Sequence, residues 1–197
     1  MPLKIIHPRH TEVMGTGLVL ISSPPVIGPK GDLNAGQIAE EVALLSRSWA
    51  IIAREIKQDQ EGDKVLQAGS DFDKSVQTFV KEYGIKCIIM IVGTSEPGIM
   101  IKAHPDDSTS EEILEIVRSG LEPHFDTRVT DSGAEDSSNQ VLPIVRLELG
   151  PDERGFMRDQ FVNSITDIIG LINTGLGFSE SKPHPGLGVS TGPDTAL

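Results

Sequence analysis

A glutamate inside a strand-like segment is the strongest candidate for chemistry in this sequence. Glu148 lies in the run Ile144–Leu149, and Gly150-Pro151 ends that run directly afterwards. Because side chains alternate along a strand, Arg146 and Glu148 are expected to share one face. A carboxylate near a strand end can act as a general base. The alternative interpretation is an ion pair between these two neighbours on an exposed edge of the sheet.

An arginine follows the same strand. Arg154 lies near the start of the segment that we expect to form the last helix. A helix N-terminus and a guanidinium both favour bound anions, so we predict a small anionic ligand near Glu148 and Arg154. Asp32, which precedes the first predicted helix, and His104, which follows a short predicted strand, are the other polar candidates for substrate binding.

Two short segments contain possible metal ligands. His7, His10 and Glu12 lie close together near the N-terminus, and His104 precedes Pro105 and two aspartates. Imidazole and carboxylate groups are ordinary zinc ligands, but most such residues in loops are simply solvated. We therefore expect no cofactor, and zinc only if the protein is an active hydrolase. The single cysteine, Cys87, sits in an apolar run and is expected to be a core residue.

The composition limits the partners of this chain. Its 197 residues include 17 basic and 29 acidic ones, for a net charge of −12. Such a chain repels phosphate backbones, so we expect no nucleic-acid partner. Apolar runs such as Cys87–Val92 are far shorter than the roughly 20 residues of a membrane-spanning helix, so we expect no membrane partner. The N-terminus resembles no secretory signal, and we expect a cytoplasmic protein. The composition does not indicate an oligomeric state.

Short apolar runs alternate with amphipathic stretches along most of the chain. This alternation predicts an α/β fold, a three-layer sandwich with a mostly parallel central sheet, of the phosphorylase/hydrolase-like kind. Val92 ends the most apolar run, and we expect it to be buried. The predicted strands cover residues 18–23, 50–53, 86–92, 99–103, 128–130 and 144–149. The predicted helices begin near Asp32, Ser70, Ser108 and Asp152.

The last part of the chain differs from the rest. Residues 176–197 are rich in Gly and Pro and show no apolar periodicity. Such a segment cannot bury enough apolar surface to offset the entropy of ordering, so we predict a disordered tail. The remaining residues, 1–175, are predicted to form a single α/β domain.

The order of these segments resembles the N-formylglutamate amidohydrolase family, whose fold is similar to that of zinc-dependent exopeptidases. The resemblance covers roughly residues 17–173. Its best motif is Val145-Arg146-Leu147-Glu148-Leu149 followed by Arg154, which looks like the family's Glu strand and the Arg after it. The resemblance implies an acid/base or water-activating role for Glu148 and a substrate-anchoring role for Arg154. Asp32 looks like the acidic residue that opens the family's first helix.

The metal motifs of that family are not matched. Pro25 stands where the family has a histidine, and Met90 and Val92 replace an aspartate and a histidine. Apolar side chains cannot coordinate zinc, so the usual zinc-bound water is not expected. We therefore predict a divergent, degenerate relative that binds a small anionic acyl-amino acid or peptide-like ligand without turnover.

Two alternatives remain open. One is an active amidohydrolase that cleaves an N-acyl amino acid and uses His7, His10 or His104 as replacement metal ligands. The other is a structural or partner-binding protein with a vestigial pocket.

Overall fold

An eight-stranded mixed sheet forms the centre of the computed structural model. The structure describes residues 2–7, 10–24, 26–27, 33–54, 56–57, 71–103, 108–131 and 142–178. The strands of the main sheet are β1 (Leu3–Ile6), β2 (His10–Met14), β3 (Val19–Ser23), β5 (Trp49–Ala53), β7 (Cys87–Gly93), β8 (Ile99–Ala103), β9 (Thr127–Asp131) and β10 (Ile144–Leu149). Two further short strands, β4 (Val26–Ile27) and β6 (Ile56–Lys57), pair with each other in parallel.

The strand order is β1-β2-β5-β3-β7-β10-β8-β9. The four central strands β5, β3, β7 and β10 are parallel. Strand β8 is antiparallel to β10, and β2 is antiparallel to both β5 and β1. The α/β class with a mostly parallel sheet, expected from the sequence, is therefore confirmed. The carboxyl ends of the four central strands lie along one edge of the sheet, called the carboxyl edge below.

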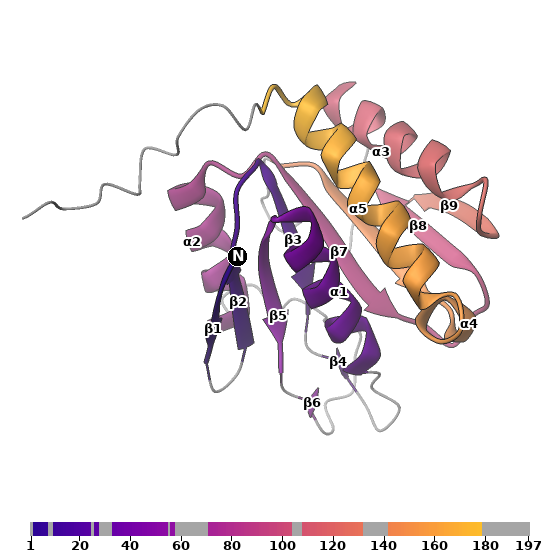
Figure 1. Ribbon diagram of the computed structural model, residues 1–197, viewed down its shortest axis with the longest axis horizontal. Coiled ribbons are helices and arrows are strands. Elements are labelled where there is room, and N and C mark those ends of the chain that lie inside the picture. Colours follow the sequence, from indigo (N-terminus) through magenta and orange to yellow (C-terminus); the bar gives the residue numbers. More distant parts are fainter. Residues whose placement is uncertain are drawn as a thin grey trace, which may run out of the picture.

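Helices cover both faces of the sheet (Figure 1). The helices are α1 (Leu33–Ser46), α2 (Asp71–Tyr83), α3 (Ser108–Leu121), α4 (Pro151–Arg154) and α5 (Arg158–Gly175). Side chains of α1, α3 and α5 pack with the strands in one large core, and α2 packs on the opposite face in a second core. The face that α2 covers is called the α2 face below. The three layers are therefore α1, α3 and α5 on one face, the sheet in the middle, and α2 on the other face.

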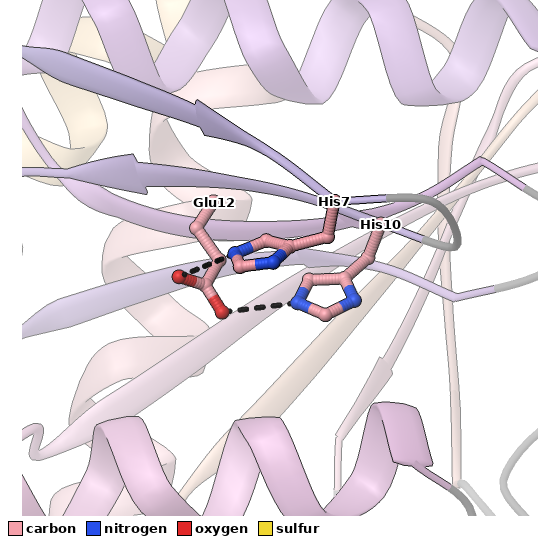
Figure 2. Close-up of side chains that lie close together, drawn as sticks. All are labelled: His7, His10 and Glu12. Atoms are coloured by element: carbon pink, nitrogen blue, oxygen red, sulfur yellow. Dashed lines mark hydrogen bonds and ion pairs between the residues drawn. The ribbon is translucent and has the colours of Figure 1, made fainter.

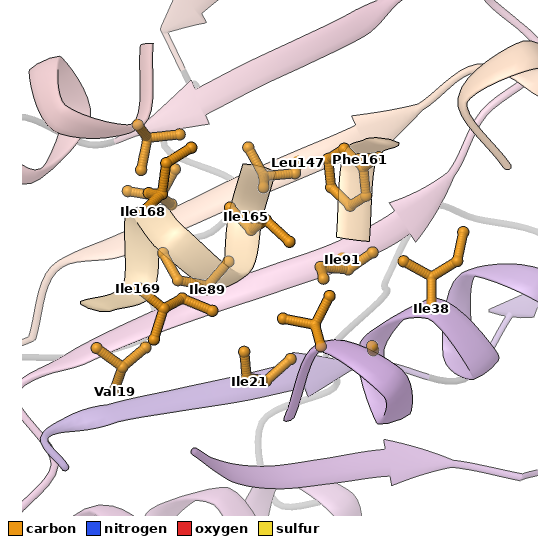
Figure 3. Close-up of a cluster of buried hydrophobic side chains, with 14 of the residues drawn as sticks. Val19, Ile21, Ile38, Ile89, Ile91, Leu147, Phe161, Ile165, Ile168 and Ile169 are labelled. Atoms are coloured by element: carbon orange, nitrogen blue, oxygen red, sulfur yellow. The ribbon is translucent and has the colours of Figure 1, made fainter. Parts of the chain in front are cut away.

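The larger core is built from aliphatic side chains that point from the strands toward α1, α3 and α5 (Figure 3). Ile89 of β7 and Leu147 of β10 are fully buried there, together with Phe161 at the start of α5. Helices α3 and α5 approach closely at Gly120, where a Cβ atom would lie 2.5 Å from Cγ1 of Ile168. A glycine at this position therefore permits the two helices to pack in direct contact.

The smaller core lies between α2 and the sheet. Phe72, Val76 and Phe79 of α2 pack with buried strand residues that include Ile51 and Ile88. At the C-terminal end of the helix, Tyr83 stacks on Trp49 with ring centroids 4.0 Å apart. Ile88 is the one β7 residue in this core among those described, so α2 covers the beginning of β7 rather than its carboxyl end.

Three details differ from the sequence-based expectations. The hairpin of β1 and β2 was not predicted, because its strands are short and partly polar. Val92 is half-buried rather than buried, because it lies beyond the part of β7 that α2 covers. The last helical segment consists of two helices, α4 and α5, because the chain turns at residues 155–157.

The end of the described chain still contacts the core. Leu176 packs against the larger core, and the Phe178 amide donates a hydrogen bond of 2.8 Å to the carbonyl of Asn173. Residues 179–197 lie outside the described residues, so the disordered tail and the domain boundary at residue 175 stay predictions. Within the described residues, no helix has both the length and the apolar character needed to cross a bilayer.

Candidate functional site

The register of the sheet brings candidate side chains from three strands together on the α2 face. In β10, Arg146 is opposite Lys102 of β8, and Glu148 is opposite Val92 of β7. Val145, Leu147 and Leu149 point into the larger core on the other face. This is the alternation expected from the sequence, although β10 is an interior strand and not an exposed edge.

Glu148 is the centre of a small charged cluster. Its Oε1 atom lies 2.9 Å from Nζ of Lys102 and 3.0 Å from Nε of Arg146. The Glu148 side chain is only 10% exposed, whereas the two cationic side chains are 28% and 20% exposed. The formal charges of these three groups sum to +1, in a chain whose net charge is −12. We call Glu148, Lys102 and Arg146 the Glu148 cluster.

Arg154 lies at the carboxyl edge, in the short helix that follows β10. Its Nη1 donates hydrogen bonds to the carbonyl oxygens of Leu149 and Thr94, the latter at 2.7 Å. The guanidinium packs so closely over Gly93 that a Cβ there would lie 2.9 Å from Nη1. Arg154 therefore joins the ends of β7 and β10, and its predicted role as an anchor for a ligand stays a prediction.

Several other predicted site residues cannot be placed in this arrangement. Asp32, His104 and Pro25 lie outside the described residues, so their predicted roles stay predictions. Met90 and Val92, in contrast, are described: they lie beside Arg146 and Glu148 on β7. The resemblance noted in the sequence implies metal ligands at these two positions. The described neighbours of Glu148 on β7 thus offer none of the imidazole, thiolate or carboxylate groups that ordinarily bind zinc.

A second group of polar residues is built by the N-terminal hairpin. The amide of His7 donates a 2.9 Å hydrogen bond to the carbonyl of His10, so these residues lie opposite each other. Glu12 is two residues further along β2 and points to the same side as His10. The two imidazole rings stack with centroids 4.5 Å apart and an interplanar angle of 19° (Figure 2).

The three side chains converge on a common point (Figure 2). Nε2 of His10 lies 3.0 Å from Oε1 of Glu12, and Nε2 of His7 lies 3.2 Å from Oε2. The three potential ligand atoms all lie within 4.8 Å of one another, and in the described part of the chain no other such group is found. We call His7, His10 and Glu12 the hairpin cluster. Sequence reasoning noted these residues, but their convergence depends on a hairpin that it did not predict.

The hairpin cluster also lies at the carboxyl edge and on the α2 face. His10 is opposite Ala53, the last residue of β5, and Glu12 is opposite Ile51, which packs under α2. However, β5, β3 and β7 separate β2 from β10. Four strand spacings of about 4.8 Å place the two clusters roughly 19 Å apart. The hairpin cluster and Glu148 therefore cannot act on the same reacting atom.

Cys87 has no part in either cluster. Its side chain is fully buried in the larger core, as expected from the sequence. Desolvation raises the pKa of the thiol from 9.0 to about 12, so the thiolate is absent from the folded protein near neutral pH. Cys87 is thus a structural residue and not a nucleophile.

Comparisons with known proteins show the fold. No protein-family model and no curated protein sequence matches the chain. Among solved structures, the gene product Atu2144 from Agrobacterium tumefaciens is similar, with a TM-score of 0.60 and 11% identity over 86% of this chain and 96% of that chain.

Two further solved structures are named as a hydrolase and an amidase. A bacteriophage poly-gamma-glutamate hydrolase aligns with a TM-score of 0.51 and 9% identity over 87% of this chain and 91% of its own. The N-acetylmuramoyl-L-alanine amidase AmiC2 of Nostoc punctiforme aligns with a TM-score of 0.50 and 11% identity over 82% of this chain and 98% of its own. The chain therefore has an amidase-like hydrolase fold. None of these three structures is named as an N-formylglutamate amidohydrolase, so the resemblance to that family in particular stays a prediction.

Proposed function

We propose that this protein is an amidase-fold domain that binds a small anionic acyl-amino acid or peptide-like ligand without hydrolysing it. The observation that supports the proposal is the environment of Glu148. Its carboxylate is bound between two cations, Lys102 and Arg146, and its neighbour on β7 is Val92. Metal-assisted hydrolysis needs ligands that hold the ion and a carboxylate placed to activate its water. Around Glu148, the described side chains supply cations and an apolar residue instead.

The same cations are suited to hold an anion. Lys102 and Arg146 keep part of their side chains exposed, and an anion near them would be attracted by the net positive charge of the cluster. The names of two similar structures, a poly-gamma-glutamate hydrolase and an N-acetylmuramoyl-L-alanine amidase, point to acyl-amino compounds as substrates of those proteins. Such compounds present a carboxylate beside an amide, and this is the ligand class that we propose.

We propose N-formyl-L-glutamate and N-acetyl-L-glutamate as the first ligands to test, by calorimetric titration with product analysis by NMR. We expect saturable binding and an intact ligand after prolonged incubation. Lys102→Met should weaken binding about 10- to 150-fold, the equivalent of a charged hydrogen bond. Lys86→Met removes an exposed lysine outside the cluster and should leave affinity unchanged.

The other outcomes separate the alternatives. Release of amine or formate would overturn the proposal in favour of an enzyme. Absence of binding to either compound and to short acidic peptides would favour a structural protein with a vestigial pocket. Equal loss of affinity in the Lys102 and Lys86 variants would exclude the Glu148 cluster as the binding site.

A metal-dependent amide hydrolase is the second candidate, and the hairpin cluster is the observation that favours it. Two histidines and one glutamate are a ligand set of catalytic zinc sites, in which the fourth position holds water. This candidate predicts turnover that a chelator abolishes and that His10→Ala removes. Because Glu148 lies roughly 19 Å away by strand spacing, Glu148→Gln should not affect that turnover.

The proposal also includes the setting in which the protein acts. We propose a cytoplasmic protein whose partner is a small molecule and not a nucleic acid or a membrane. The acidic composition and the single buried Cys87 support this view, since neither polyanion binding nor a disulfide is expected of such a chain.

A further inference from the structure

We propose that His7, His10 and Glu12 form a binding site for Zn²⁺ or a chemically similar divalent transition metal. This site differs from the metal positions that the family resemblance implies. It is also separate from the Glu148 cluster. This inference is therefore independent of ligand binding by the Glu148 cluster, and it deepens the second candidate function, which uses the same three residues.

The backbone of the hairpin places the three side chains before any ion binds. Strand β2 is paired on both sides, with β1 and with β5, so His10 and Glu12 are held by an interior strand. His7 faces His10 across the end of the hairpin, and opposed residues of two paired strands point to the same face. Three ligands thus converge at little cost in conformational entropy, which favours affinity.

The distances between the ligand atoms suit a tetrahedral ion. Zinc bonds of about 2.0–2.2 Å to nitrogen and oxygen imply neighbouring ligand atoms about 3.3 Å apart. The two nitrogen–oxygen distances in the cluster are 3.0 and 3.2 Å. Each of these distances involves a different oxygen of Glu12, and ligand atoms of the three residues all lie within 4.8 Å of one another. Small rotations of the side chains can therefore bring both imidazoles and the carboxylate around one ion without movement of the strands.

The His7 nitrogen that faces Glu12 makes no well-aligned hydrogen bond with any described residue. Nε2 of His7 is shielded from solvent and, within the described part of the chain, makes no hydrogen bond of acceptable geometry. It nevertheless lies 3.2 Å from Oε2 of Glu12. Nε2 of a neutral imidazole faces the carboxylate either as an N–H donor or as a lone pair, and in the lone-pair tautomer a cation between the two atoms removes the repulsion. A bound metal ion is such a cation.

The ligand set also selects the kind of ion. Mg²⁺ and Ca²⁺ prefer sites made entirely of oxygen atoms, whereas imidazole nitrogens favour zinc, cobalt, nickel and copper. The three side chains are 39%, 15% and 17% exposed, in the order His7, His10 and Glu12, so an ion can enter from solvent. Three protein ligands leave the fourth position of a tetrahedral ion for water or another small ligand.

The test is a titration of the full-length protein, stripped with a chelator, with ZnCl₂ and separately with CoCl₂. We expect one high-affinity equivalent of Zn²⁺ by calorimetry, the intense visible bands of tetrahedral Co²⁺, and no response to Mg²⁺. His10→Ala and Glu12→Gln should each weaken Zn²⁺ binding more than about 100-fold, since loss of an outer-shell partner alone costs about 10- to 100-fold. His124→Ala removes an exposed histidine in a turn and should leave Zn²⁺ binding unchanged.

Three results would overturn the site. They are no Zn²⁺ binding by the wild-type chain, binding that persists in a His7→Ala/His10→Ala double variant, and an octahedral Co²⁺ spectrum. Circular dichroism should show that each variant is folded. If His10→Ala fails to fold, His7→Ala decides the question, because His7 lies outside the strands and its loss leaves the β1–β2 pairing intact.

Discussion

Replacing Glu148 by glutamine should destabilise the protein through the two cations that it leaves behind. Glu148 is 8% exposed, and its Oε1 is the shared partner of Lys102 and Arg146 at 2.9 and 3.0 Å. Breaking a fully buried ion pair costs about 3–5 kcal/mol, and an exposed pair is worth about 0.2–1 kcal/mol. Because the carboxylate is buried and the cations are partly exposed, we expect Glu148→Gln to cost about 2–3 kcal/mol.

Urea denaturation followed by circular dichroism measures this cost. Glu112→Gln, at an exposed position of α3, is the matched control and should change the free energy of unfolding by less than about 0.5 kcal/mol. In a Lys102→Met background, the free-energy cost of Glu148→Gln should fall by about 1 kcal/mol. The reason is that only one cation, Arg146, then loses its carboxylate partner. If Glu148→Gln costs no more than the control and shows no coupling to Lys102, the charged cluster does not exist in solution and the reasoning fails.

Three further predictions concern the rest of the fold. Asn173→Ala should cost about 1–3 kcal/mol in thermal unfolding, because the buried Oδ1 accepts a 2.8 Å hydrogen bond from the Leu18 amide. Gly120→Ala should cost about 1–3 kcal/mol, because the new Cβ would lie 2.5 Å from the Ile168 side chain. Burial raises the pKa of the Cys87 thiol from 9.0 to about 12, so its contribution to stability is complete below pH 9 and is lost as the pH rises from 9 to 12. Relative to Cys87→Ala, the wild type should lose about 1.4 kcal/mol between pH 8 and pH 10, measured by urea denaturation.

Each of these predictions has a result that contradicts it. An Asn173→Ala variant as stable as the wild type would mean that water replaces the lost acceptor. Full stability of Gly120→Ala would show that α3 and α5 separate easily. Parallel pH profiles of the wild type and Cys87→Ala, or rapid labelling of the native thiol at pH 8, would show that Cys87 is accessible.

Long apolar patterns explain why most of the fold could be predicted from the sequence. The run Ile144–Leu149 has alternating polarity, and the structure confirms both the strand and the shared face of Arg146 and Glu148. The helices predicted to begin near Ser70 and Ser108 also agree with the structure, in which α2 begins at Asp71 and α3 at Ser108. In these segments local periodicity and tertiary packing favour the same conformation.

Cross-strand partners could not be predicted in this way. Lys102 joins Glu148 only because β8 pairs antiparallel with β10, and that register is a property of the whole sheet. The hairpin cluster could not be predicted from the sequence for a related reason. The segment between His7 and His10 lacks the Asn-Gly or Asp-Gly signal of a tight hairpin, so the pairing that stacks the two rings was not evident.

The most direct test of the central claim is a calorimetric titration of the wild-type protein with N-formyl-L-glutamate, followed by NMR of the same sample. Binding by the Glu148 cluster predicts a saturable isotherm that Lys102→Met weakens about tenfold or more, with the formyl group still attached to glutamate at the end. Free formate in the spectrum, or an isotherm that Lys102→Met leaves unchanged, would contradict the account.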